Sequence, residues 1–123
     1  MKTLALTSST VLALAIAAGP GYAQAGTQTV TGHLVDVMCA TKHASEGAKY
    51  GATHDKSCLL MDDCVKSGYS VLTADNKVVK LDAKGSAMAL ELIKKTARER
   101  DWKVTVNGAL AGDTMTVSSL TLQ

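Results

Sequence analysis

Three cysteines and two histidines fall within one short stretch of the chain: Cys39, His43, His54, Cys58 and Cys64. Thiolate and imidazole groups suit Zn(II) and Cu(I), and four such ligands can complete a closed tetrahedral site. The predicted ligand set is therefore Cys39, His43, Cys58 and Cys64, with His54 as a replacement for one of them. The sequence lacks a Cys-x-x-Cys pair, so spacing gives this metal hypothesis moderate support.

The same cysteines also allow a disulfide. An odd number of cysteines in an oxidising compartment leaves one thiol over after pairing. If one helix carries both Cys58 and Cys64, they are separated by about 9 Å of rise and about 120° of rotation, which is too far for a bridge between them. Cys39 is then expected to pair with Cys58 or Cys64. In this alternative the protein is a binding or interaction module, and the bridge only holds a long loop.

Patterns that would indicate catalysis are missing from the sequence. It has no Cys-x-x-Cys-His motif for haem, and no Ser-His-Asp order or Gly-rich phosphate loop can be defended. We expect no enzymatic activity, with thiol-redox chemistry at Cys58 as a remote alternative because a helix start favours the thiolate. Met38 and Met61 adjoin the cysteines but are expected to pack against apolar neighbours. His33 is expected at the surface or at a sheet edge.

Residues 1–25 have the pattern of a cleaved signal peptide. Lys2 precedes an apolar run of roughly 15 residues, which is too short for a membrane span of about 20. Ala23 and Ala25 are the small residues that a signal peptidase recognises, so cleavage is expected before Gly26. The remaining chain, residues 26–123, is predicted to be a single secreted or periplasmic domain.

The composition excludes several partners. The chain has 13 Lys and Arg side chains, one of them Lys2, against 11 Asp and Glu, so residues 26–123 are nearly neutral and have no block of like charge. This pattern favours neither nucleic acid nor an anionic membrane surface. We expect a monomer whose partner is unknown. Phe is absent, so a small aliphatic core would gain from a cross-link or a metal.

The elements that must position the cluster are mostly strands. Alternating apolar residues predict strands over 29–38, 69–73, 78–81, from Val104, and from Met115 to the end, with a helix from a Ser86 cap to near Asp101. Asp75 and Asn76 suit the turn between the second and third strands. The apolar phase changes in the last strand, which predicts a bulge near Ser118 and Ser119.

The long connection between the first two strands, residues 40–67, carries most of the cluster. Its first half, through His54, is expected to be irregular. Its second half is expected to form a helix over 58–66, with Ser57 as the cap and Gly68 as a left-handed stop. The fold class is thus mainly β with one or two short helices. The order strand, long loop, strand, strand, helix, strand, strand is that of a five-stranded OB-fold-like barrel.

Two motifs carry a resemblance to a family. They are Asp36-Val-Met-Cys39 followed by His43, and two further cysteines before the Gly68-Tyr69 hairpin start. Together with Val104 to Gly108 and Thr116 to Ser119, they resemble a family of small exported, largely uncharacterised bacterial proteins with an OB-like barrel and an Asp-x-x-Cys-x-x-x-His pattern. The resemblance implies export and a barrel fold, and adds little on activity. Five residues separate Cys58 from Cys64, which is wider than in many members of that family.

Overall fold

Five strands close into a barrel in the computed structural model, which describes residues 26–123. The strands are β1 (Gln28–Asp36), β2 (Tyr69–Leu72), β3 (Val78–Leu81), β4 (Lys103–Ala111) and β5 (Thr114–Leu122). Their order around the barrel is β1-β2-β3-β5-β4, and only the β3–β5 pair is parallel. The expected signal peptide lies outside the described residues. The fold is mixed α/β, with all five strands in the expected order.

The turn and the bulge of the barrel are where the sequence places them. Asn76 has a φ of 66°, which a tight turn between β2 and β3 requires. In the β4–β5 pair, Asn107 faces Ser119 while Gly108 faces Val117, so Ser118 is the extra residue of a bulge. The predicted bulge is confirmed. It lets both halves of β5 turn apolar side chains inward.

The connection between β1 and β2 is far more helical than expected. It contains α1 (Val37–His43), a 3-10 turn η1 (Ala44–Glu46), α2 (Gly47–Thr53), α3 (Lys56–Leu59) and α4 (Asp62–Ser67). The prediction of an irregular first half was wrong, as was that of a strand reaching residue 38. Asp36 ends β1 because its carboxylate accepts a hydrogen bond from the Cys39 amide and caps α1.

The single helix expected over 58–66 is in fact two helices. The Asp55 carboxylate, not the Ser57 hydroxyl, caps the first by accepting a hydrogen bond from the Cys58 amide at 2.9 Å. Met61 has extended backbone angles and separates α3 from α4. Gly68 ends α4 with a φ of 80°, as predicted. Because the helix is broken at Met61, the rise and rotation calculated for a continuous helix do not describe Cys58 and Cys64.

The long helix, α5 (Ala83–Lys95), starts and ends earlier than predicted. Asp82 caps it by accepting a hydrogen bond from the Gly85 amide at 2.9 Å, and the same oxygen accepts one from the Val117 amide. Ser86 instead accepts a hydrogen bond from the Tyr69 amide. The helix stops at Lys95 because Thr96 is extended, and its hydroxyl donates to the Leu92 carbonyl.

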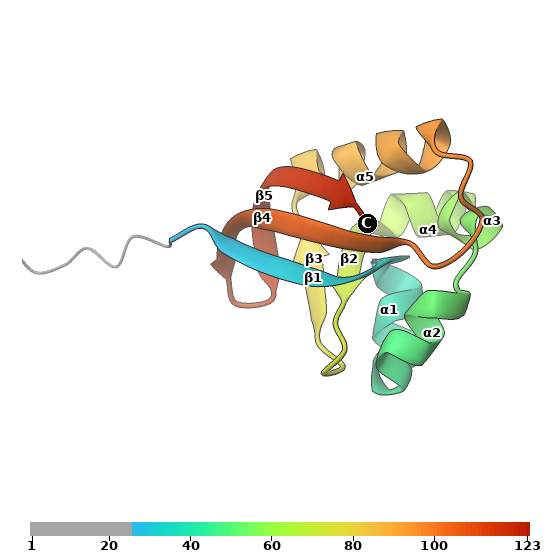
Figure 1. Cartoon of the computed structure of the whole chain (residues 1–123), viewed down its shortest axis with the longest axis horizontal. Helices are drawn as coiled ribbons and strands as arrows, with labels where there is room; N and C mark the ends of the chain where they lie inside the picture. Colours follow the sequence, from blue (N-terminus) through green and yellow to red (C-terminus); the bar gives the residue numbers. More distant parts are fainter. Residues whose placement is uncertain (1–25) are drawn as a thin grey trace, which may run out of the picture.

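The helices occupy two sides of the barrel (Figure 1). The short helices α1 to α4 gather at one end, while α5 lies along the barrel next to β5. The main core fills the barrel with Leu34, Val106, Met115, Trp102 and similar residues, and a smaller cluster of Val35, Ala40 and Leu72 joins β1 to α1. No helix within residues 26–123 is long and apolar enough to cross a membrane.

Candidate functional site

The site is built where β1 passes into α1. Asp36 is the last residue of β1, and its side chain is fully buried. One carboxylate oxygen accepts a hydrogen bond from the Cys39 amide at 2.9 Å. This cap fixes both the start of α1 and the position of Cys39 in its first turn. A buried carboxylate needs such partners, because an unpaired charge in the interior is costly.

Cys64 completes a compact group with Asp36 and Cys39. One ligand-type atom from each residue, a carboxylate oxygen and two sulfurs, lies within 4.8 Å of the other two. Cys64 comes from α4, which two hydrogen bonds hold against α1: the Val37 amide to the Gly68 carbonyl, and the Met38 amide to the Ser67 hydroxyl. Residues far apart in sequence thus form the Asp36–Cys39–Cys64 cluster.

His54 lies behind the carboxylate of this cluster. Its Nε2 is 3.1 Å from the other Asp36 carboxylate oxygen, and its side chain is 3% exposed. Because Asp36 is an acceptor when ionised, Nε2 is the donor of this hydrogen bond. Tyr50 packs beside it, with the two ring centroids 5.3 Å apart. His54 therefore contacts the cluster through Asp36.

Burial, hydrogen bonds and charge shift the pKa values of the three groups in the cluster. Burial raises the pKa of Asp36, but the hydrogen bonds from His54 and Cys39 outweigh it and leave that pKa below its ordinary value. Burial, followed by the negative charge of Asp36, raises the pKa of Cys64 to about 12. Burial also raises the pKa of Cys39. The site thus holds one carboxylate beside two thiols that stay protonated at neutral pH.

Two of the predicted ligands are not part of this cluster. The His43 ring stacks on Tyr50 with centroids 4.1 Å apart, and its Nδ1 lies 2.5 Å from a Glu46 carboxylate oxygen. Cys58 lies in the first turn of α3, where its amide donates a hydrogen bond to the Asp55 carboxylate. Among residues 26–123, no group of three mutually close ligand atoms includes His43, Cys58 or His54. Of the five predicted site residues, Cys39 and Cys64 lie together in the cluster, and His54 contacts the cluster only through its hydrogen bond to Asp36.

The three cysteines are free thiols in the described part of the chain. The Cys39 and Cys64 sulfurs lie within 4.8 Å of each other but not at bonding distance. The pairing of Cys39 with Cys58 or Cys64 therefore stays a prediction. Met38 and Met61, expected to pack inside, are 42% and 58% exposed. His33, expected at the surface or at a sheet edge, is buried beneath α2, pairs with both β2 and β4, and hydrogen-bonds Asp101 at 2.6 Å.

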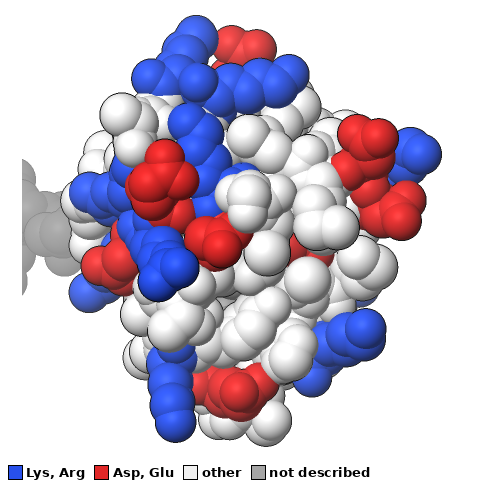
Figure 2. All heavy atoms as spheres, turned by 90° about the vertical axis from the view of Figure 1, so that its right-hand side faces the viewer, with Lys and Arg blue, Asp and Glu red and all other residues white. Residues whose placement is uncertain are grey.

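The helical end of the molecule has no face of a single charge. Figure 2 shows this end with a broad uncharged area, bordered by acidic and basic side chains that are mixed together.

Comparisons with family models, curated proteins and solved structures found no match for this chain.

Asp36 is the site residue that the predicted ligand set lacks. It appears in the Asp-x-x-Cys pattern of the sequence. The pattern itself contains the relevant information, because Asp three residues before Cys at the end of an apolar strand is an N-cap that places the cysteine. A carboxylate that caps such a helix lies near the cysteine in its first turn.

Proposed function

We propose that the protein is a small exported metal-binding module that holds Zn(II) or Cu(I) at the Asp36–Cys39–Cys64 cluster. The observation that carries this proposal is the convergence of three ligand-type atoms within 4.8 Å. Two thiolates suit either ion, and a carboxylate suits Zn(II).

The ionisable groups of the cluster favour the binding of a cation. Burial raises the pKa values of both thiols, and the negative charge of Asp36 raises them further. A bound cation would replace the two thiol protons and relieve the repulsion among three anions. His54 would then act as the outer partner that orients the Asp36 carboxylate, a role that such histidine–carboxylate pairs have around metals. Three protein ligands would leave one tetrahedral position for water or an external group.

Metal titration of the reduced protein tests the proposal. We expect close to one equivalent of Zn(II) or Cu(I) per chain, measured against a competing chelator. Cys64→Ser and Asp36→Asn should each weaken binding at least about tenfold, because each removes a ligand. His43→Ala is the matched control and should leave the affinity unchanged. Saturable binding that survives Cys64→Ser would place the metal elsewhere.

A second function is favoured by the distance between the two thiols. Cys39 and Cys64 would need only a small movement to form a disulfide, which would tie α1 to α4 in a domain that binds a partner without metal. Counting thiols in the protein as exported separates the two proposals. Three free thiols together with bound metal support the metal module, and one free thiol supports the disulfide.

We also propose that the barrel is an OB-fold. The strand order β1-β2-β3-β5-β4, the parallel β3–β5 pair and the position of α5 between β3 and β4 support this assignment. Membership in the family of small exported bacterial proteins with the Asp-x-x-Cys-x-x-x-His pattern is proposed on the same footing. An experimental structure and the mass of the exported chain would test the fold and the cleavage before Gly26.

A further inference from the structure

A cavity separates α4 from α5, away from the thiol cluster. Its volume is about 360 Å³, which falls in the range of small-molecule sites. Six residues line it: Leu60, Asp62, Val65, Lys66, Leu90 and Lys94. None of them belongs to the Asp36–Cys39–Cys64 cluster, so this cavity is unused by the proposed metal site.

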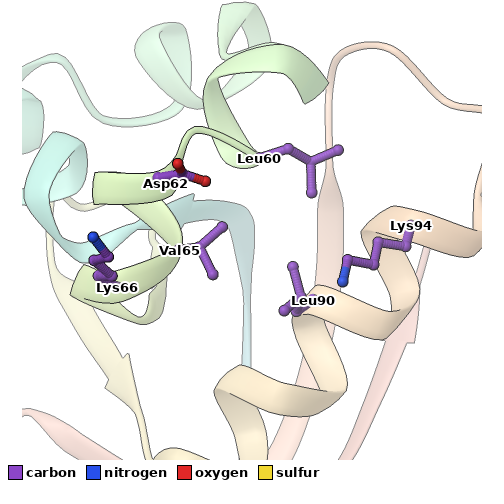
Figure 3. A pocket seen from close by; sticks show the side chains of 6 residues that line it. All are labelled: Leu60, Asp62, Val65, Lys66, Leu90 and Lys94. Carbon is purple, nitrogen blue, oxygen red and sulfur yellow. The ribbon is translucent and has the colours of Figure 1, made fainter.

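The floor of the cavity is apolar. Figure 3 shows Val65 on α4 and Leu90 on α5 pointing toward each other across the gap, with Leu60 beside them. Leu60 and Leu90 are half-buried and pack against the main core of the barrel. Each therefore keeps apolar surface exposed to water that an apolar ligand could cover with a gain in free energy.

The rim of the cavity carries an excess of positive charge. Lys66 and Lys94 are exposed on opposite walls, and neither has a hydrogen bond or an ion pair with any residue that the structure describes. By contrast, Lys77, Lys80 and Lys95 each lie beside a carboxylate. Asp62 is the one acidic lining residue, so the rim has a net charge of one positive unit.

We propose that this cavity binds a small amphipathic monocarboxylate. Its apolar body lies on the Leu60–Val65–Leu90 floor, and its carboxylate lies between the Lys66 and Lys94 ammonium groups. The flexible lysine stems let both charges reach one carboxylate while their methylene groups cover part of the ligand. A charge-assisted contact of this kind is stronger than a contact between neutral groups.

Octanoate is the probe for the test, with octanol and octylammonium as ligands of the same length and different charge. Binding is measured by calorimetry on the exported protein in the presence of chelator. We expect saturable binding of octanoate, with octanol at least about fivefold weaker and octylammonium weaker still. Equal binding of all three ligands would contradict recognition of a carboxylate. No saturable binding of octanoate would contradict the proposed binding site.

Charge reversal at the rim locates the site. Lys94→Glu is expected to weaken octanoate binding about tenfold, and Lys66→Glu to do the same, because an attractive charge becomes repulsive. Lys84→Glu is the matched control, because Lys84 lies on the same helix but does not line this cavity, so the affinity of this variant should equal that of the unchanged protein. Both rim lysines are exposed, so the variants should fold normally. Unchanged affinity in Lys94→Glu would contradict the proposal.

Discussion

At the residue scale, Asp36 has three tasks in the structure. It ends β1, caps α1 through the Cys39 amide, and holds His54 by its second oxygen. Its charge also lies beside both thiols and disfavours their ionisation. One carboxylate thus links the start of the helical segment to the chemistry of the cluster.

The reactivity of the thiols should follow from their burial and from this charge. With a pKa of about 12, Cys64 has very little thiolate at pH 8, and it is buried. In the reduced native protein we expect iodoacetamide to modify Cys58 first and Cys64 last, as followed by peptide mass spectrometry. Asp36→Asn should speed the modification of Cys64 at pH 8, because losing the negative charge lowers the thiol pKa. Alkylation in urea is the control and should remove the order.

Residue types alone could indicate where the cluster is, but not which members meet. Cys39 was predicted to share a metal site with Cys58 and Cys64 or to form a bridge with one of them, and the structure brings Cys39 close to Cys64. His43 was predicted as a ligand because it is an imidazole close to Cys39 in the sequence, yet it lies at the end of α1 and stacks on Tyr50. Its position depends on η1 and α2, and short helices of this kind leave almost no periodic signal in a sequence.

At the element scale, α2 can cover the site only because it lies very close to β1. A side-chain carbon at Gly51 would come within 2.4 Å of the His33 Cβ. This helix carries Tyr50 and ends at His54, so its distance from β1 sets the distance of both rings from Asp36. A glycine inside a predicted irregular loop gave no hint of this contact, because close approach is a tertiary property.

Gly51→Ala should therefore disturb the site from a distance. The added methyl group must push α2 away from β1, and overpacking of this kind costs about 1 to 3 kcal/mol. We expect a lower free energy of unfolding in urea and weaker metal binding, because the His54–Asp36 contact lengthens. Ala52→Ser, on the exposed side of the same helix, should change neither. A Gly51→Ala protein with full stability and affinity would mean that α2 tolerates a different position.

The strands and the helices of the connection differ in how well the sequence predicts them. Alternation, the Asp75-Asn76 turn and the Ser118 bulge predicted the barrel, because each depends on neighbours in sequence or on a two-residue period. The helix starts were misplaced where a carboxylate competed with a hydroxyl, as at Asp82 against Ser86. Either residue is a good cap, and only the path of the neighbouring strands decides between them.

At the scale of the whole molecule, the cluster joins segments that the barrel alone does not hold. Cys39 and Cys64 lie near the two ends of the helical connection, so a link between them closes almost all of it. A disulfide closing a loop of about 25 residues would stabilise the protein by roughly 3 to 4 kcal/mol. A metal at a hundred times its dissociation constant would contribute about 2.7 kcal/mol. The disulfide and the metal would stabilise the protein by similar free energies, so the size of the stabilisation does not distinguish the two links.

The agent that removes the stabilisation can distinguish them. We expect Cys39→Ser and Cys64→Ser each to lower the melting temperature by about 10 to 20 °C, because a domain of this size loses roughly 4 to 8 °C per kcal/mol. Cys58→Ser, which leaves the cluster intact, should lose much less. For a metal link, chelator should lower the unchanged protein to the level of Cys64→Ser and leave that variant unaffected, whereas a disulfide would respond to reductant alone. Equal losses from all three cysteine variants would show that Cys58 shares the link, and would contradict the three-residue cluster.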